Sequence, residues 1–119
     1  PIEMEQILHG KNMPSYEDLA RYVYFTATGE EFNAADIDQK KGFIGTSKQY
    51  PGGVFLYYEP DMKYLMNTAL TLDMAKALGP HKNKKRLVFA PQKYLDQDYL
   101  DIHRIDYHQL PFEIYRFKD

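Results

Sequence analysis

Apolar and polar residues in the last third of the chain follow a pattern that predicts strand, helix and strand in succession. Residues 87–90 are all apolar and are followed by Pro91, and residues 105–110 form a second run of strand length. Between the two runs, apolar residues recur at helical spacing, namely Leu95, Tyr99, Leu100 and Ile102. This pattern is typical of a parallel strand–helix–strand crossover.

One amphipathic helix is predicted near the start of the chain, over residues 15–28. Ser15 can accept a hydrogen bond from a free backbone amide, and Asp18 in the first turn interacts favourably with the helix dipole. Gly29 is suited to end the helix. The apolar stripe consists of Leu19, Val23 and Ala27, with Ala20 and Tyr24 beside it. Residues 30–41 are polar and charged, and they predict a surface loop.

A β-hairpin is predicted in the middle of the chain, with strands over residues 42–47 and 54–59. Residues 50–53 join them and read Tyr-Pro-Gly-Gly, in which proline fixes one φ angle and glycine adopts the positive φ of a tight turn. Residues 54–58 are apolar at every position, which is typical of a central strand covered on both faces. Residues 42–47 are interpreted as a strand with a glycine at a β-bulge.

A single long helix is predicted over residues 60–78. Pro60 is tolerated at the first helical position, and Gly79 with the following proline ends the helix. The apolar residues keep helical spacing throughout this range. Leu65, Ala69 and Leu72 are therefore expected to face the sheet.

The order of these elements predicts an α/β fold, a three-layer domain with a mixed, mainly parallel sheet and βαβ crossovers. Residues 15–119 are expected to form a single α/β domain, preceded by a linker or N-terminal arm over residues 1–14. The chain begins with proline and lacks an initiator methionine. We therefore interpret it as a C-terminal domain excised from a larger protein.

Composition narrows the class of protein without indicating an activity. With 119 residues the chain is long enough for one domain with its own core. Its net charge of -2 argues against a wholly basic nucleic-acid-binding surface, although a local basic patch remains compatible with it. There is no cysteine, no apolar run of the roughly 18 residues that span a bilayer, and no signal-peptide pattern. A cytoplasmic protein without membrane contact is expected.

No catalytic, cofactor-binding or metal-binding motif occurs in the sequence. The histidines lack metal-ligand spacing, and Asp96, Asp98 and Asp101 are better explained as a helix N-cap with first-turn acids than as a divalent-ion cluster. Residues 42–47 contain two glycines but are too short for a dinucleotide-binding loop and are not followed by a helix. His108 is interpreted as a surface or edge position. We predict no catalytic residue, no cofactor and no metal ion in this chain.

A run of positive charge precedes the strand at residue 87. Lys82, Lys84, Lys85 and Arg86 are candidate contacts for DNA phosphates, because such a loop neutralises backbone charge without reading bases. The alternative is a solvated loop that only protects the edge of the sheet.

The C-terminal end is rich in aromatic residues. Phe112, Tyr115 and Phe117 are candidates for a surface that docks onto another domain or protein, because aromatic rings supply large contact area at low entropic cost. Packing in the core of the domain itself is the alternative.

Three blocks of the sequence carry a resemblance to a known family. They are SYEDLARYVYFTATGEEF at residues 15–32, VFLYYEPDMKYLMNTALTLDMAKAL at 54–78 and KRLVFAPQKYLDQDYLDIHRIDYHQLPFEIYRF at 85–117. These blocks resemble the C-terminal region of bacterial site-specific DNA adenine methyltransferases, the modification subunits of type III restriction-modification systems. The resemblance covers most of the chain and lies in structural stretches, not in catalytic motifs.

The resemblance implies a parent enzyme that binds S-adenosylmethionine and methylates the exocyclic amine of adenine. The family's base-holding motif, Asp/Asn-Pro-Pro-aromatic, and its cofactor motif, Phe-x-Gly-x-Gly, are both absent from this chain. The resemblance therefore implies an accessory C-terminal domain that is inactive alone. Its implied partners are the catalytic domain of the parent methyltransferase, DNA through that parent, and a restriction subunit or a second methyltransferase subunit.

Two other classes of function stay open. One is a stand-alone α/β interaction or sensor domain unrelated to DNA modification. The other is an enzyme whose site is assembled from scattered residues such as His103, Asp106 and His108, which show no reciprocal spacing.

Overall fold

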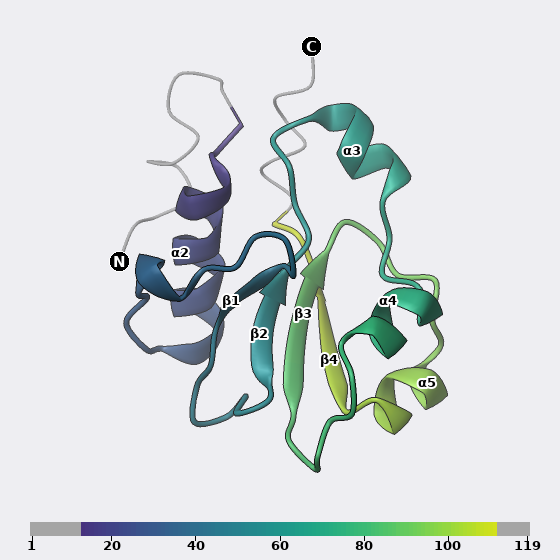
Figure 1. Cartoon of the computed structure of the whole chain (residues 1–119). Coiled ribbons are helices and arrows are strands. Elements are labelled where there is room, and N and C mark those ends of the chain that lie inside the picture. The colour runs from purple at the N-terminus through teal and green to yellow at the C-terminus, as the bar shows by residue number, and fades with distance from the viewer. Residues whose placement is uncertain (1–12, 112–119) are drawn as a thin grey trace.

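The computed structural model describes residues 13–111 of the chain, and a sheet of four strands lies at their centre (Figure 1). The strands follow one another in the order β1-β2-β3-β4. β1 is antiparallel to β2, whereas β2, β3 and β4 are mutually parallel. The strands are β1 (Phe43–Gly45), β2 (Gly53–Leu56), β3 (Arg86–Ala90) and β4 (Ile105–Gln109). The predicted mixed, mainly parallel sheet is confirmed.

Helices cover both faces of this sheet and make a three-layer α/β domain, as predicted (Figure 1). Helix α2 (Tyr16–Thr28) packs on one face, and the crossover helices α4 (Leu72–Ala77) and α5 (Gln97–Ile102) pack on the other. Helix α3 (Met62–Asn67) lies beyond the carboxyl ends of the parallel strands (Figure 1). None of the helices within residues 13–111 is long and apolar enough to cross a membrane.

The core consists of two clusters because side chains alternate across the strands. In β3, Leu87 and Phe89 belong to the cluster under α2, whereas Val88 and Ala90 belong to the cluster under α4 and α5. All four residues of β2 are buried, as the apolar run predicted for a central strand. Each fully buried aliphatic side chain contributes about 1.5–3 kcal/mol to the stability of the fold. Burial of the apolar runs therefore stabilises the sheet.

The ends of the helices agree with the sequence prediction. The Ser15 hydroxyl accepts a hydrogen bond from the Asp18 amide at 3.1 Å, and Gly29 ends α2 with φ at 71°. The Asp96 carboxylate caps α5 by accepting from the Tyr99 amide at 3.3 Å. Asp96 is thus a helix cap, as expected.

The hairpin of β1 and β2 is confirmed, including its irregularity. The Gly53 amide donates to the Tyr50 carbonyl oxygen at 3.0 Å and closes the tight turn. The strand register shifts between Phe43 and Gly45, and Gly45 has φ at 151°, a conformation that favours glycine. The predicted bulge therefore lies at Gly45.

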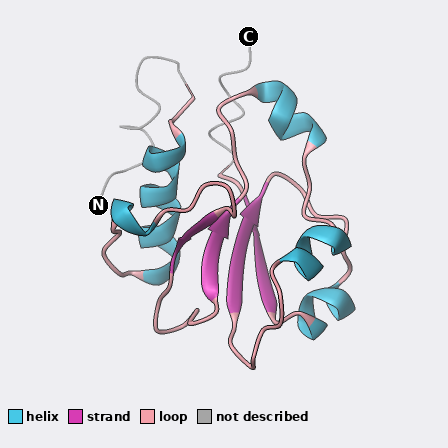
Figure 2. Cartoon of the chain, in the orientation of Figure 1, coloured by secondary structure: helices cyan, strands magenta, loops and turns pink. Residues whose placement is uncertain are grey.

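The prediction of one long helix over residues 60–78 is wrong. The structure has two short helices, α3 and α4, joined by an extended segment at residues 68–71 (Figure 2). Leu65 of α3 packs in the cluster under α2, whereas Leu72 of α4 packs in the opposite cluster. These two residues therefore do not share one helix face, although Leu65 is buried as expected.

Tertiary pairing accounts for the break between α3 and α4. Leu70 is fully buried and extended, its amide donates to the Gln92 carbonyl oxygen at 2.8 Å, and its carbonyl oxygen accepts from the Tyr94 amide at 2.9 Å. The Thr71 hydroxyl then caps α4 by accepting from the Met74 amide at 3.3 Å. Helical spacing of apolar residues carries no information about these contacts, which come from a segment about 20 residues further along.

Candidate nucleic-acid interface

The basic residues gather where the parallel strands begin. Because β2, β3 and β4 are parallel, the connections that precede them all lie at the amino edge of the sheet, at the bottom of Figure 1. These connections are the hairpin turn at residues 46–52, the loop at 78–85 and the short turn at 103–104. We call this surface the basic edge; its described lysines and arginines are Lys48 in the hairpin turn, Lys82, Lys84 and Lys85 in the loop before β3, and Arg104.

The loop before β3 is a tight turn with an unusual backbone. The Lys84 amide donates to the His81 carbonyl oxygen at 2.9 Å, and the Asn83 amide donates to His81 Nδ1 at 2.8 Å. Lys82 and Asn83 have φ angles of 51° and 61°, the left-handed pair of a type I′ turn. Asparagine tolerates this conformation well, whereas lysine adopts it at a cost of about 1 kcal/mol. The turn leaves the side chains of Lys82 and Lys84 exposed.

Arg86 differs from the lysines because it is buried. The prediction that it contacts DNA phosphates is therefore wrong. Only 2% of its surface is exposed, because β3 directs it under α4 and α5. Its Nη1 donates to the Gly79 carbonyl oxygen at 2.8 Å, and its Nη2 donates to the His103 carbonyl oxygen at 2.6 Å. Burial lowers the pKa of Arg86, and nearby Tyr57 partly opposes that change. Arg86 therefore ties the ends of two helices to the sheet and is not available to DNA.

Lys85 is partly engaged within the fold. Its ammonium lies 3.3 Å from the carboxylate of Asp106, which also accepts a hydrogen bond from the Tyr50 hydroxyl at 2.8 Å. Burial together with that hydrogen bond raises the pKa of Tyr50 to about 12. Half-exposed Lys85 is thus a weaker candidate for a phosphate contact than Lys82 and Lys84, because contact with DNA competes with Asp106.

Arg104 is the functional candidate that the sequence analysis missed. It is exposed, has φ at 52°, and stands at the residue where a glycine usually follows a helix. Its carbonyl oxygen accepts from the Arg86 amide at 2.9 Å, which places it beside the basic loop. The wall of a shallow cavity of about 320 Å³ contains Lys85 and Arg104 together with the acidic Asp101 and Asp106. The sequence did contain a signal for this residue. A basic residue directly before the next parallel strand lies at the same edge of the sheet as the loop before the preceding strand.

Close backbone packing holds the basic loop against the hairpin turn. The Gly52 amide donates to the Lys85 carbonyl oxygen at 2.9 Å. A Cβ atom added at Gly52 would lie 2.6 Å from Arg86 Cγ and 2.8 Å from that carbonyl oxygen. Only glycine fits here without displacing backbone, so the position of the loop is fixed by contacts that a larger residue would break.

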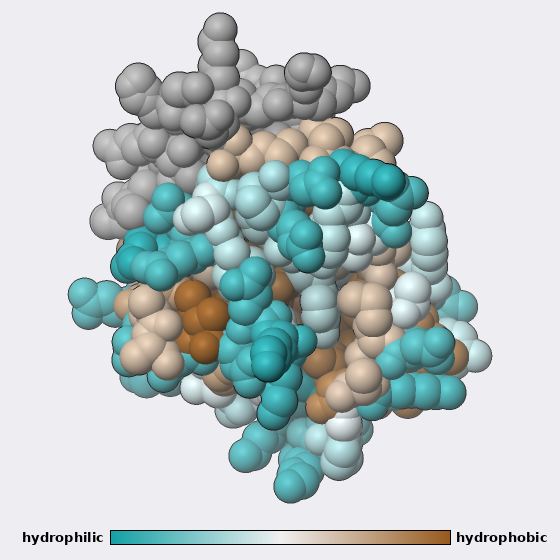
Figure 3. Space-filling view, turned by 45° about the horizontal axis from the view of Figure 1, so that its top comes forward, coloured by the Kyte–Doolittle hydropathy of each residue, from teal (hydrophilic) through white to brown (hydrophobic). Residues whose placement is uncertain are grey.

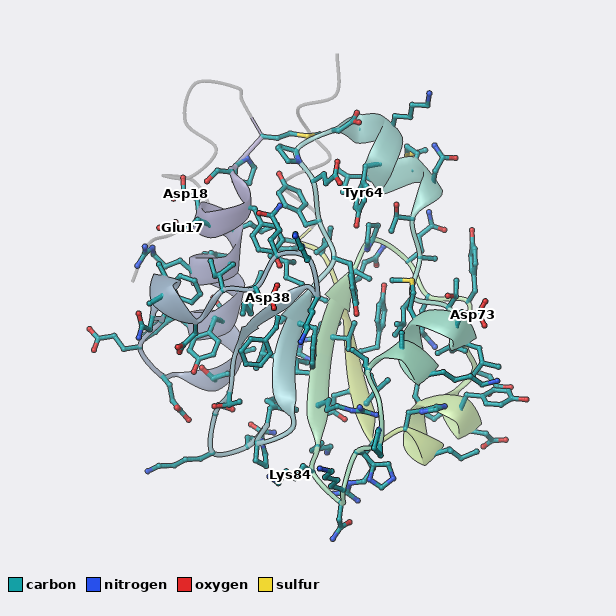
Figure 4. The ribbon with its side chains drawn as sticks, in the orientation of Figure 1. Glu17, Asp18, Asp38, Tyr64, Asp73 and Lys84 are labelled. Carbon is teal, nitrogen blue, oxygen red and sulfur yellow. The ribbon has the colours of Figure 1, made fainter. Side chains whose placement is uncertain are left out.

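Charge is separated along the molecule. Figure 4 shows Lys84 at one end and the acidic Glu17 and Asp18, in the first turn of α2, toward the other end. Within residues 13–111, Lys82, Lys84 and Arg104 have no ion-pair partner, whereas Arg21 is paired with Glu17 at 3.1 Å. A chain of net charge -2 therefore still presents a locally positive end, which is the arrangement that attracts a polyanion.

Residues singled out for other roles do not form a second site. Among the described residues, no group of three or more histidine, cysteine or acidic side chains is arranged to hold a metal ion. His108 is exposed on the outer strand β4 and contacts the ring of Phe89, with the ring centroids 5.3 Å apart. Phe112, Tyr115 and Phe117 lie outside the described residues, so the predicted docking surface stays a prediction.

Exposed apolar residues are scattered over the described surface. On the face shown in Figure 3, hydrophobic areas are small and separated by hydrophilic residues. The large apolar residues with the greatest exposure are Met66 at 62%, Ile102 at 63% and Tyr94 at 71%. Isolated residues of this kind are normal on a protein surface and do not define an interface.

Comparisons of the chain with protein-family models, with curated proteins and with solved structures found no match. The basic edge and the sequence resemblance are therefore the two observations from which a function can be argued.

Proposed function

We propose that the chain is a non-catalytic accessory domain that contacts DNA through its basic edge, within a site-specific DNA adenine methyltransferase of the restriction-modification type. The observation that carries the proposal is a cluster of cations, Lys82, Lys84 and Arg104, which have no ion-pair partner among residues 13–111 and lie at one edge of the sheet. Their side chains are exposed, they come from two separate loops, and backbone hydrogen bonds hold Lys84 and Arg104.

The basic edge suits phosphate contact better than reading of bases. Its cations, Lys82, Lys84 and Arg104 among them, lie on turns, and in the described part of the chain no helix projects from this edge that could enter a major groove. Such a surface positions a duplex and adds affinity without sequence preference. In a methyltransferase the recognition of the target sequence would then belong to other parts of the parent protein.

The assignment to a methyltransferase is supported by the resemblance of residues 15–32, 54–78 and 85–117 to the C-terminal region of that family. The chain lacks the base-holding and cofactor motifs, so the chemistry and the S-adenosylmethionine site belong to the proposed catalytic domain of the parent. That catalytic domain is one proposed partner. A restriction subunit or a second methyltransferase subunit is another.

DNA contact is tested by fluorescence anisotropy with a labelled duplex of about 20 base pairs, titrated at salt concentrations from about 50 to 200 mM. With three phosphate contacts, the slope of log K against the logarithm of the salt concentration is expected to be about -3. The expected dissociation constant is about 10⁻⁴ to 10⁻⁶ M and does not depend on the DNA sequence. Replacing Lys82, Lys84 and Arg104 with glutamine is expected to abolish binding.

The matched control is a second triple variant, Lys63→Gln, Lys76→Gln and Lys93→Gln. These exposed lysines lie outside the basic edge, so the variant loses the same net charge elsewhere on the surface. The control is expected to keep the salt slope. Equal loss of binding in both triple variants would contradict a local site, and wild-type protein without affinity for DNA would favour the stand-alone interaction domain.

The methyltransferase assignment has its own test, in the coding sequence that precedes residue 1. An Asp/Asn-Pro-Pro-aromatic motif together with a Phe-x-Gly-x-Gly motif is expected there. A preceding reading frame without both motifs would remove the assignment while leaving the DNA contact to be judged by its own measurement.

A further inference from the structure

A pocket of about 430 Å³ lies between α4 and the loop that precedes β1, on the face of the sheet that α4 and α5 cover. Its floor consists of Phe55 and Tyr57, and one wall is the side of α4 that carries Met74 and Leu78. The volume falls within the range of about 300–1,000 Å³ that is common for small-molecule sites. The lining residues are Lys40, Lys41, Phe55, Tyr57, Met74, Ala77 and Leu78.

The pocket exists because the crossover helices cover only part of their face of the sheet. Helices α4 and α5 pack over Val88 and Ile105, so β3 and β4 are covered, while Phe43 and Tyr57 near β1 and β2 are only partly buried. Phe43 and Phe55 contact edge to face, with centroids 5.7 Å apart, and so hold the aromatic floor in place. A flat apolar molecule is the shape that such a floor accepts.

The mouth of the pocket is positively charged. Lys40 and Lys41 are exposed in the loop at its rim, and none of its described lining residues is acidic. The acidic residue of the first turn of α4, Asp73, points away from β1 and β2 in Figure 4. The two ammonium groups therefore attract an anion without competition from a lining carboxylate.

The floor adds a polar group beneath this positive rim. Burial raises the pKa of Tyr57, the neighbouring Tyr64 adds to that effect, and Arg86 opposes it. The Tyr57 hydroxyl is thus neutral at pH 7 and lies within the electrostatic range of the buried guanidinium. Among the described residues, Arg86 Nε is the buried side-chain nitrogen that has no hydrogen-bond partner. Positive potential therefore extends from the rim to the floor.

We propose that this pocket binds a small aromatic anion, with the ring on Phe55 and Tyr57 and the anionic group between Lys40 and Lys41. The apolar walls select a flat ring, and the lysines select a carboxylate or another acidic substituent over a neutral one. The cations of the basic edge are not among the residues that line this pocket, and the proposal goes beyond the proposed contact with DNA.

The test uses 2-naphthoate as the probe and the uncharged 2-naphthalenemethanol as its matched neutral partner, with binding followed by amide chemical shifts in two-dimensional NMR. For a ligand of this size a dissociation constant of about 1 mM is expected. The alcohol is expected to bind about fivefold more weakly, which is the effect of one ion pair near a surface. The amides that shift are expected to be those of Phe55, Tyr57 and Met74.

Two variants distinguish the part of the pocket that binds the aromatic ring from the part that binds the anionic group. Ala77→Trp places a large side chain in the pocket from an exposed position at the end of α4, and it is expected to abolish binding of both probes. Lys40→Gln with Lys41→Gln is expected to remove the preference for naphthoate, whereas the control Lys63→Gln with Lys93→Gln keeps it. Equal affinity of the wild type for both probes would overturn the proposal, as would no saturable binding up to about 10 mM. Naphthoate binding that survives in Ala77→Trp would overturn it equally.

Discussion

Arg86 offers the sharpest test of how this fold positions its basic edge. Its guanidinium makes two charge-assisted hydrogen bonds, to the carbonyl oxygens of Gly79 and His103, at 2.8 and 2.6 Å. Bonds to charged groups contribute about 1.5–3 kcal/mol each, and truncation also leaves the two carbonyl groups without a partner. The desolvation of the guanidinium and its unpaired Nε reduce the net gain. Arg86→Ala is therefore expected to cost about 3 kcal/mol.

This loss corresponds to a large shift in melting temperature. At about 2.1 cal/mol/K per residue, the 119 residues give an unfolding entropy of about 0.25 kcal/mol/K, so 3 kcal/mol lowers the melting temperature by about 12 °C. Arg86→Lys keeps one charged donor and is expected to lose about half as much. The neighbouring exposed pair supplies the control, because Lys85→Gln is expected to cost less than about 1 kcal/mol.

The assay is circular dichroism during thermal and urea unfolding, combined with amide hydrogen exchange. Exchange is expected to accelerate at Gly79, His103 and Arg104 in the Arg86→Ala variant, since the loops that the guanidinium holds would open first. A loss of less than about 1 kcal/mol in Arg86→Ala would refute the reasoning. So would identical stability of the Arg86→Ala and Lys85→Gln variants.

Four further predictions follow from particular residues. Leu65→Asp buries an unpaired charge in the cluster under α2 and is expected to cost several kcal/mol, on the order of 3 or more; an unchanged melting temperature would contradict that packing. Calorimetric titration with S-adenosylmethionine is expected to show no heat of binding, because the cofactor motif is absent, and micromolar affinity would contradict this. The fold raises the pKa of Tyr50 from 10.0 to about 12, so deprotonation favours the unfolded chain, and stability is expected to persist below pH 10 and to fall between pH 10 and 12. Urea midpoints measured at several pH values check that window, and Tyr50→Phe should lessen the fall without removing it, because burial also raises the pKa of Tyr16 and Tyr58. Lys82→Gly relieves a left-handed backbone and is expected to raise stability by about 0.5–1 kcal/mol while weakening DNA binding, measured by urea unfolding and anisotropy; a loss of stability would contradict the strain.

The parts of the fold that the sequence predicted correctly are those determined by local patterns. Runs of consecutive apolar residues predicted β2 and β3, because a strand that is buried on both faces is apolar at nearly every position. Ser15, Gly29 and Asp96 marked helix ends because each acts on backbone groups within three or four residues of itself. A glycine within residues 42–47 indicated a bulge, and the structure places it at Gly45, whose φ few other residues adopt.

The parts that could not be predicted depend on contacts between distant segments. Leu70 keeps the helical spacing of its neighbours, yet its pairing with residues 92–94 extends the backbone and divides the expected helix. Arg86 is one of four basic residues among residues 82–86, yet it is the first residue of β3, and strand alternation turns it inward. Arg104 stands alone in the sequence and joins the lysines only through the parallel pairing of β3 with β4.

Backbone strain at the basic edge supports the proposed binding surface over a solvated loop. Within residues 13–111, the non-glycine residues with positive φ are Lys82, Asn83 and Arg104, and all three lie at this edge. A loop that only caps the sheet would be more stable with glycine at Lys82 and Arg104, since each cationic residue costs about 1 kcal/mol in that conformation. Strained residues are found mainly at sites whose geometry is used for binding. The two cations therefore make physical sense at this cost in stability if their side chains contact an anion.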